Sequence, residues 1–368
     1  MLIAGEASGD NHGAHLVKSI KKLDNHLEFF GIGGHNLEKQ GMEIIIPSST
    51  LSVVGLTEVL SKLNVVFDAA KKVKLLLKKR NPDLLILIDY PEFNLHIAKK
   101  AKELGIPVLF YVSPQIWAWR SGRVKKIKKL VDHMAVILPF EVDFYKKHGV
   151  PATYVGNPLL DTFIEPKEID SNEKLKIGLL PGSREGEVER LLPIMAKAAE
   201  ILKKNFPNVT FQIPLASSID KEQINEILNK QTLANNPCFE IIEQGVQSVF
   251  DNCKIVIVTS GTATLEAALA LKPMVIIYTV SPISYFLGRL FIKVKNIGLA
   301  NLVAGERLVP ELIQKDASPE NIARVITELM NNPKKLGQIQ KKLKQVKKKL
   351  GSSGASDRTA KIALELLK

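Results

Sequence analysis

Short runs of apolar residues alternate with longer amphipathic stretches along nearly the whole chain of 368 residues. Several of the runs are apolar at every position, which is typical of parallel strands that are covered on both faces. The runs predict strands at Leu2–Ala4, Leu84–Asp89, Val108–Val112, Met134–Leu138, Ile177–Leu180, Phe211–Pro214, Ile255–Thr259 and Met274–Tyr278. Strands that alternate with helices predict an α/β protein with parallel sheets.

The amphipathic stretches between these runs predict the helices. Apolar residues recur at helical spacing in residues 12–22, 66–80, 95–104, 187–204, 264–271 and 356–368. A polar, acidic segment without clear periodicity, residues 161–174, separates one α/β series from a second one. A chain of this length is expected to form about two or three domains, and we place a boundary in this segment.

The net charge indicates what kind of partner the protein binds, and the cysteine content indicates its redox compartment. The net charge of +13 favours an anionic partner, such as nucleic acid, an acidic lipid surface or phosphorylated ligands, although a generic lysine-rich surface gives the same excess. The two cysteines, Cys238 and Cys253, form no CxxC pair, so a disulfide framework or a zinc site is not expected and a reducing compartment fits. We see no signal-peptide pattern and no apolar run of about 18 residues.

Glycine-rich turns follow strands in both halves of the chain. Residues 5–10 (GEASGD), 180–187 (LPGSREGE) and 259–266 (TSGTATLE) each connect a predicted strand to a predicted helix. Such a turn lets the backbone approach a ligand closely, and the N-terminus of the following helix favours an anion. In the first turn Ser8 or Asp10 could instead simply cap the helix.

The second and third turns also carry side chains suited to a nucleotide. Arg184 can pair bidentately with phosphate beside Gly182 and Ser183, or it can pair with Glu187 on the next helix. Glu266 can accept hydrogen bonds from ribose hydroxyls. The alternative interpretation of this turn is that Thr262 or Thr264 simply caps the helix, with Glu266 in its first turn.

Asp89 is the main candidate for a general base. It follows an apolar strand and so lies at the carboxyl edge of the sheet, where open α/β sheets bind their ligands. A carboxylate at this place can either take a proton from a substrate or cap the next helix. Glu92 is a rival carboxylate three residues later.

Two further segments combine apolar and basic residues. Residues 113–123 (SPQIWAWRSGR) contain both tryptophans of the chain and precede several lysines. Tryptophan usually packs in a core, but it can also stack on RNA bases, and no RNA-binding module pattern accompanies it. Residues 51–60 (LSVVGLTEVL) precede a basic helix that ends at Arg80, which suits either an anionic membrane interface or ordinary packing on a sheet.

Taken together, the motifs resemble the lipid-A-disaccharide synthase family. The resemblance rests on GEASGD, SPQIWAWRSGRVKKI, LPGSREGEVE, SGTATLEAAL and NLVAGERLVPEL, which occur in one order over essentially the whole chain. It implies a GT-B fold, in which two Rossmann-like domains face each other across a cleft. Residues 1–165, completed by a C-terminal helix at 352–368, would form the acceptor and membrane-facing domain. Residues 166–351 would bind the UDP-sugar.

The resemblance also implies a reaction in lipid A (lipopolysaccharide) biosynthesis. An inverting transferase would join the sugar of UDP-2,3-diacylglucosamine to 2,3-diacylglucosamine 1-phosphate (lipid X) and release UDP. Asp89 would act as the base, with Asp10, Glu6 and Glu92 as alternatives, and Arg184 would neutralise the leaving diphosphate. No DxD-like pair calls for a metal, so we expect neither a metal nor a cofactor. We expect donor contacts at Ser8, Gly9, Gly182, Ser183, Arg184, Ser260, Gly261, Thr262, Glu266, Asn301 and Glu306.

The substrates carry acyl chains and anionic groups, which favours a membrane partner over nucleic acid. We expect Val53, Val54 and Leu56 to touch acyl chains, with the protein peripheral on the cytoplasmic face of the inner membrane. A homodimer that exchanges C-terminal segments is compatible with the resemblance. The alternatives are another GT-B transferase or epimerase that uses UDP-GlcNAc, and a non-catalytic protein that binds RNA or membranes.

Overall fold

The computed structural model describes residues 1–51, 56–119, 121–167, 174–216, 218–231, 238–281 and 294–367, without the side chains of residues 56–63 and 119. These residues divide into two compact units. The first unit contains the described residues up to Thr162 and residues 350–367, and the second contains the described residues from Phe163 to Lys349. Each unit has a parallel sheet of its own.

The first unit is built on seven parallel strands in the order β3-β2-β1-β4-β5-β6-β7. The strands are β1 (Leu2–Ala4), β2 (Phe30–Gly33), β3 (Glu43–Pro47), β4 (Leu85–Ile88), β5 (Val108–Tyr111), β6 (His133–Val136) and β7 (Ala152–Tyr154). The helices are α1 (Ala7–Leu23), α2 (His35–Lys39), α3 (Leu56–Arg80), α4 (Pro91–Glu103), α5 (Ile116–Trp119), α6 (Val124–Leu130), α7 (Pro139–Lys147), α8 (Leu159–Thr162) and α17 (Ala355–Leu366), with 3-10 turns at Ser48–Thr50 and Ser121–Arg123. The strand order reverses between β1 and β4.

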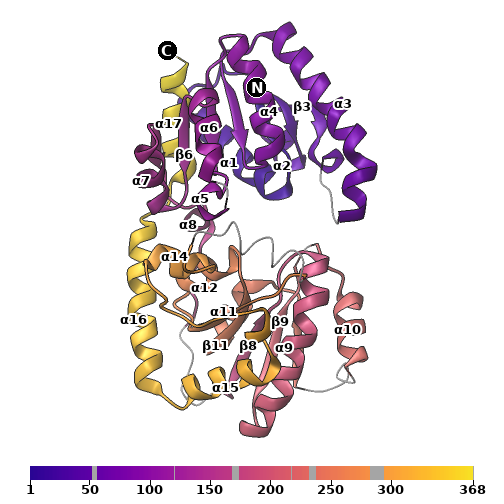
Figure 1. Ribbon diagram of the computed structural model, residues 1–368, viewed down its shortest axis with the longest axis vertical. Helices are drawn as coiled ribbons and strands as arrows, with labels where there is room; N and C mark the ends of the chain where they lie inside the picture. The colour runs from indigo at the N-terminus through magenta and orange to yellow at the C-terminus, as the bar shows by residue number, and fades with distance from the viewer. Residues whose placement is uncertain are drawn as a thin grey trace. The chain divides into compact units, whose positions relative to one another are not determined.

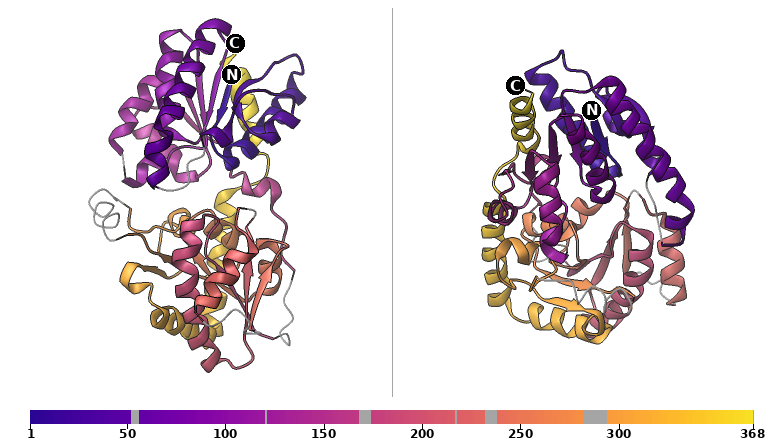
Figure 2. Two further views of the ribbon diagram at one scale, coloured as in Figure 1. Left: turned by 90° about the vertical axis from the view of Figure 1, so that its right-hand side faces the viewer. Right: turned by 45° about the horizontal axis from the view of Figure 1, so that its top comes forward.

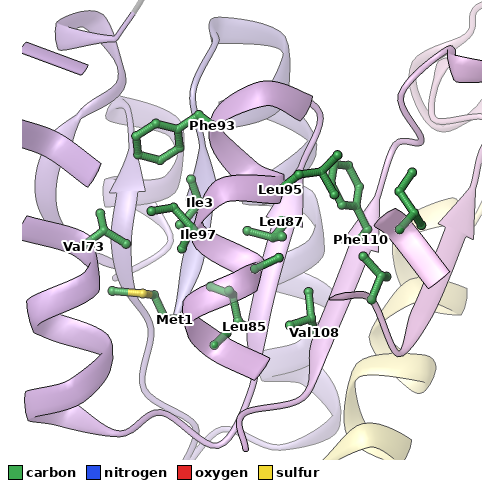
Figure 3. Packing of buried hydrophobic residues seen from close by; sticks show 14 of the residues in the cluster. Met1, Ile3, Val73, Leu85, Leu87, Phe93, Leu95, Ile97, Val108 and Phe110 are labelled. Carbon is green, nitrogen blue, oxygen red and sulfur yellow. The ribbon is translucent and has the colours of Figure 1, made fainter. Parts of the chain in front are cut away.

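Side chains that alternate along each strand build two apolar layers, one on each face of this sheet. Ile3, Leu87 and Phe110 point to the face that is covered by α3 and α4, as Figure 3 shows. Leu2 and Ile88 point to the opposite face, where they pack with residues of α1, α2 and α17. Burial on both faces explains why the central strands are apolar at every position.

The C-terminal helix α17 belongs to the first unit and lies against its sheet beside α1 (Figures 1 and 2). Polar contacts hold the segment that leads into it. Arg358 donates from Nε to the carbonyl oxygen of Val155 at 2.6 Å, and Asp161 accepts the backbone N–H of Gly354 at 2.5 Å. The last helix therefore completes a core whose strands all come from the first half of the chain.

The second unit repeats the same winding on six parallel strands, in the order β10-β9-β8-β11-β12-β13. The strands are β8 (Lys176–Leu180), β9 (Thr210–Pro214), β10 (Phe239–Ile242), β11 (Ile255–Thr259), β12 (Met274–Tyr278) and β13 (Glu311–Ile313). The helices are α9 (Glu185–Asn205), α10 (Lys221–Lys230), α11 (Val246–Asn252), α12 (Ala263–Leu269), α14 (Leu299–Ala304), α15 (Pro319–Met330) and α16 (Pro333–Leu350), with a 3-10 turn at Gln314–Asp316. The order reverses between β8 and β11, as in a Rossmann fold, so the predicted α/β class with two Rossmann-like domains is confirmed.

Candidate functional site

The first candidate region is the point where the strand order of the first sheet reverses. Ala4 of β1 pairs with Ile88 of β4, so the turns that begin at Gly5 and Asp89 leave the sheet side by side. A Cβ atom on Gly5 would lie 2.6 Å from Cδ1 of Tyr90, so only glycine lets the Tyr90 ring pack there. Open α/β sheets bind ligands at such switch points, and the sequence places Glu6 and Asp89 there.

The backbone at Asp89 is strained and is held by a buried asparagine. Asp89 and Tyr90 have φ angles of +49° and +43°, a left-handed conformation that costs about 1–3 kcal/mol per residue outside glycine. Asn94 is fully buried and donates from Nδ2 to the carbonyl oxygens of Asp89, at 2.6 Å, and Ile88, at 3.2 Å. The half-buried Asp89 carboxyl is thereby carried on a fixed turn. Asn94 was not among the site residues predicted from the sequence.

The other carboxylates of this region differ in how far they are engaged. Asp10 is buried and accepts three backbone N–H groups at the start of α2, those of Gly34 at 2.6 Å, Asn36 at 3.0 Å and Leu37 at 3.3 Å. Both of its oxygens are therefore committed to holding α2, which speaks against Asp10 as the base. Glu92 forms an ion pair with Arg123.

Glu6, Ser8 and Gly9 lie where the first turn enters α1. Glu6 is half-buried and Ser8 is exposed. Burial, with a smaller contribution from the charge of Glu6, raises the pKa of the neighbouring Tyr90. Gly9 is buried, and a Cβ atom there would meet Cβ of Ala4 at 3.5 Å, so Gly9 lets α1 approach β1 closely.

Trp117, from the tryptophan-containing segment, is a core residue. Its side chain is buried, its ring edge packs on Phe140 with centroids 4.8 Å apart, and its Nε1 donates to Oε1 of Glu141 at 3.0 Å. Stacking on nucleic-acid bases therefore does not apply to Trp117. The side chain of Trp119 lies outside the described residues, as do Val53, Val54 and the side chain of Leu56.

The second candidate region is the switch point of the second sheet. Leu180 of β8 pairs with Val258 of β11, so the LPGSRE and TSGTAT turns leave neighbouring strands. Gly182 has a φ of +118°, and a Cβ atom there would collide with the carboxylate of Glu187. Gly261 is open instead, since a Cβ atom there would meet nothing within 4 Å. Both turns thus place backbone atoms at the carboxyl edge of the sheet.

Arg184 lies at the N-cap position of α9, a helix of 21 residues, beside Ser183, which is exposed. Its side chain is 75% exposed, and its Nη1 donates to Oε1 of Glu187 at 3.0 Å, so the pairing with Glu187 that the sequence allowed is present. An exposed pair of this kind contributes about 0–1 kcal/mol. Arg184 can therefore leave Glu187 and bind a phosphate at little cost in free energy. The N-terminus of α9 favours the same anion.

Hydroxyl groups of the TSGTAT turn divide into bonded and exposed ones. Ser260 donates from Oγ to the carbonyl oxygen of Ile297 at 3.0 Å, and Thr264 donates to that of Gly261 at 2.8 Å. Thr262 is exposed at the N-cap of α12, and it makes no side-chain capping bond within the described part of the chain. The hydroxyl of Thr262 is the one most available to a ligand.

Glu266 is the most distinctive group of the second region. The side chain is half-buried in the first turn of α12, and burial raises the pKa of its carboxyl above the ordinary value of 4.5. Among the described residues it has no hydrogen-bond or ion-pair partner. A partly desolvated acceptor without a partner fits the ribose hydroxyls that acidic residues bind in nucleotide sites.

Asn301 and Glu306 have partners within the protein. Asn301 is fully buried and exchanges hydrogen bonds with the backbone of Val309 at 2.9 and 3.0 Å, and it donates to Glu311 at 2.8 Å. Glu311 also accepts the N–H of Gly298 at 2.9 Å. The exposed Glu306 pairs with Lys342 at 2.8 Å. Asn301 thus frames the loop behind the TSGTAT turn, and donor contact by either residue stays a prediction.

A family model described as lipid-A-disaccharide synthetase matches residues 1–366. The chain is 46% identical over 377 residues to a lipid-A-disaccharide synthase of Geobacter metallireducens, with 100% of this chain and 97% of the relative covered. It is 41% identical over 377 residues to one of Coxiella burnetii, with 100% and 98% covered.

Solved structures show that the fold is shared more widely. The structure of S. aureus MnaA with UDP has a TM-score of 0.65 at 13% identity and covers 100% of this chain and 96% of that one. MurG of Acinetobacter baumannii has a TM-score of 0.60 at 15% identity, with 99% and 98% covered. At such low identity these structures support the GT-B fold alone, whereas the family match and the full-length relatives show that this chain belongs to the lipid-A-disaccharide synthases, a family of glycosyltransferases.

Proposed function

We propose that this protein transfers the sugar of UDP-2,3-diacylglucosamine to the 6-hydroxyl of 2,3-diacylglucosamine 1-phosphate, with inversion at the anomeric carbon. The observation that carries the proposal is the chemistry at the two switch points. One presents a carboxylate on a fixed turn, and the other presents glycine turns, Arg184 and a carboxyl without a described partner, Glu266. A proton acceptor and a nucleotide-diphosphate site are the two parts that such a transfer needs.

The second unit supplies the donor site in this proposal. Glu266 accepts hydrogen bonds from the ribose, while Arg184, Ser183 and the backbone at Gly182 bind the diphosphate. As the bond between the anomeric carbon and the diphosphate oxygen breaks, negative charge grows on that oxygen. Arg184 and the N-terminus of α9 stabilise this charge, so no metal ion is needed for it. The UDP bound to MnaA, on a similar fold, is consistent with this assignment.

The first unit supplies the base. The oxygen of the acceptor's 6-hydroxyl attacks the anomeric carbon, and its proton passes to the carboxylate of Asp89. Asp89 is assigned by its place, because it directly follows β4 at the switch point, on a turn whose carbonyl groups Asn94 holds. Both oxygens of Asp10 accept backbone N–H groups at the start of α2, and Glu92 pairs with Arg123. Glu6 is the remaining alternative at this switch point.

An anionic membrane surface is the proposed place of work, with α3 as the contacting element. Three large apolar side chains of α3 are exposed: Val65 at 37%, Phe67 at 65% and Leu75 at 64%. Phe67, Lys71 and Leu75 follow at four-residue spacing and share one face, and Lys78, Lys79 and Arg80 end the helix. Exposed apolar residues between lysines fit the interface of an anionic leaflet, here the cytoplasmic face of the inner membrane. None of the described helices is long and apolar enough to span a bilayer.

The test is product formation from radiolabelled UDP-2,3-diacylglucosamine and the lipid acceptor presented in mixed micelles. We expect a labelled disaccharide and one equivalent of UDP. UDP-GlcNAc, supplied alone, is the control for an epimerase, and UDP-GlcNAc with the lipid acceptor is the control for a transferase of unacylated sugar. Product only in either control would replace the proposal with that activity.

A further inference from the structure

The segment that carries both tryptophans, residues 113–123, has no part in the chemistry proposed above, yet its placement is specific. It follows β5, the neighbour of β4 in the sheet, so it leaves the same sheet edge beside the turn of Asp89. Val112, directly before it, has a φ of +62°. That conformation is an outlier for a β-branched side chain and persists only where surrounding contacts impose it.

Helix α7 imposes the first of these contacts through Glu141. The carboxylate of Glu141 is 1% exposed and accepts Nε1–H of Trp117 at 3.0 Å on one oxygen and the backbone N–H of Leu138 at 3.0 Å on the other. Ser113 bonds to the same helix through Tyr145, whose hydroxyl lies 2.7 Å from Ser113 Oγ. Two residues of the segment are thus bonded to the two buried side chains of α7, Glu141 and Tyr145.

The other end of the segment is tied to the turn of Asp89 itself. Arg123 forms an ion pair with Glu92 in the first turn of α4, three residues after Asp89. The segment is therefore held at Ser113 and Trp117 by α7, and at Arg123 by α4. Residues 113–118 follow β5 directly, so they lie beside the turn of Asp89 at the edge of the sheet.

Burying a carboxylate costs desolvation free energy, so stability alone does not explain why a carboxylate holds this loop. Complete burial raises the pKa of Glu141 to about 7, against the hydrogen bonds from Trp117, Leu138 and Ser113, which act in the opposite direction. Replacing buried charges by apolar residues of similar volume is often neutral or stabilising. The carboxylate does fix the geometry of the loop, because each of its oxygens holds a donor at a set angle and distance.

We propose that Glu141 is a positioning residue for the acceptor site: through Trp117, and together with the contact of Ser113 to Tyr145 on the same helix, it holds residues 113–118 at the sheet edge, in the arrangement that receives the lipid acceptor beside Asp89. The inference rests on the proposed function and assigns this segment to the acceptor and not to the donor.

Steady-state kinetics of the full-length Glu141→Gln protein tests the assignment. We expect kcat/KM for the lipid acceptor to fall about tenfold to a hundredfold, since a displacement of about 1 Å can cost that much, while the Kd for UDP stays within twofold. Glu103→Gln, which removes an exposed carboxylate of α4 that pairs with Lys100, is the matched control and should leave both unchanged. Normal acceptor kinetics in a folded Glu141→Gln protein would overturn the proposal.

Trp117→Phe removes the same hydrogen bond from the other side and covers the case in which Glu141→Gln does not fold. We expect the same defect for the acceptor, and a double variant that is no worse than the more affected single one, because both break one contact. Equal losses for acceptor and UDP would indicate general loosening and would contradict the positioning role. Absence of any transfer by the parent protein would instead refute the proposed function.

Fluorescence supplies a readout that a merely stabilising residue would not give. In a Trp119→Phe background, Trp117 is the sole tryptophan, so its emission reports the carboxyl that it contacts. We expect the emission to titrate near pH 7 with Glu141 present and not with Glu141→Gln. Tyr145, the other titratable group in the network, does not interfere, because burial raises its pKa far above neutrality. A titration that persists in Glu141→Gln would mean that Trp117 senses another group.

Discussion

At the switch point of the first sheet two successive residues, Asp89 and Tyr90, are left-handed without being glycine, and the side chain of Asn94 holds the carbonyl groups of Ile88 and Asp89. At the switch point of the second sheet the corresponding turn has a left-handed glycine, Gly182, and Arg184 beside it is 75% exposed. In the first region a strained turn and buried hydrogen bonds hold one carboxylate in place. The second presents backbone and flexible charge.

The difference follows from what each region has to bind. A general base acts over a hydrogen-bond distance of about 2.6–3.2 Å, so its carboxylate has to be held in place before the substrate arrives. A diphosphate carries its own charge and several acceptor oxygens, so an exposed arginine and the N-terminus of a helix can adjust to it. Substitutions at the rigid base and at the adaptable anion site are therefore expected to have different effects.

The largest effect is expected from Asp89→Asn. It keeps the shape of the side chain and removes the base, so kcat should fall by roughly 10²–10⁴-fold while UDP affinity changes little. Product formation under saturating donor and a separate UDP-binding measurement distinguish the two. Glu103→Gln, which removes an exposed carboxylate of α4 that pairs with Lys100, is the control. Near-normal turnover in Asp89→Asn would remove it as the base and move the assignment to Glu6.

Substitution of Arg184 by alanine should act mainly on the donor. We expect kcat to fall by about 10²–10³-fold, as when one preorganised donor to a developing anion is lost, and UDP to bind more weakly as well. Arg324→Ala, an exposed arginine that pairs with Glu328 in the same unit, is the control for loss of surface charge. If Arg184→Ala binds UDP with the parental affinity and turns over at the parental rate, the diphosphate lies elsewhere.

Glu266→Ala should weaken UDP binding by roughly 10-fold to 100-fold, since hydrogen bonds to a charged group contribute about 1.5–3 kcal/mol. The decisive comparison uses UDP and 2′-deoxy-UDP in calorimetric titrations. The parent protein should prefer UDP, and Glu266→Ala should bind both nucleotides alike. If the variant retains the preference for the ribose hydroxyl, Glu266 does not hold the ribose.

The surface of α3 should respond more weakly. Phe67→Ser together with Leu75→Ser should reduce co-sedimentation with vesicles of phosphatidylglycerol several-fold, and Val53, Val54 and Leu56 replaced by serine should add to the loss. The side chains of Phe67 and Leu75 are 65% and 64% exposed, so a folding cost within about 0.5 kcal/mol is expected. Leu23→Ser, at a 52% exposed position on α1, is the matched control. Unchanged vesicle binding would remove α3 as the contact.

The last expected effect is on stability and not on activity, and it concerns pH and the first region. The folded protein holds the Glu141 proton up to about pH 7, whereas the unfolded chain releases it near the ordinary value of 4.5. The contribution of Glu141 to the free energy of unfolding is therefore greatest below pH 4.5 and falls as the pH rises to 7. Thermal unfolding of the parent and of Glu141→Gln should show a stability difference that shifts in favour of the variant over this interval. A constant difference would contradict the raised pKa.

The central strands were predictable because burial on both faces leaves no place for polar residues. β1, β8 and β11 were located from their apolar runs, and β11 was predicted with the bounds that it has in the structure. Strands nearer the margins of the sheets gave no such pattern. β2 (FGIG), second from one edge of its sheet, contains two glycines, and β10 (FEII), an edge strand, is half-buried throughout, so neither forms a continuous apolar run, and both were missed.

Helix starts were less predictable than helix centres. α1 begins at Ala7 inside the GEASGD motif, five residues before its predicted start, because Gly9 and Gly13 pack closely against the sheet and its neighbours and so tolerate a helical position that their propensity disfavours. α3 likewise begins at Leu56 and not at Val66. For α1, packing outweighs local preference.

The sequence by itself determined the α/β class, the two series of strands and the turns that carry Gly182, Arg184, Glu266 and Asp89, because periodicity and turn chemistry are local properties. Only the tertiary structure decided which polar residues are free to act. Asp10 contacts backbone groups 24 to 27 residues away, and Asn301 bonds to Glu311 across a loop. A hydrogen-bonding side chain is a candidate site until its partners are known, and those partners are set by strand order and not by spacing along the chain.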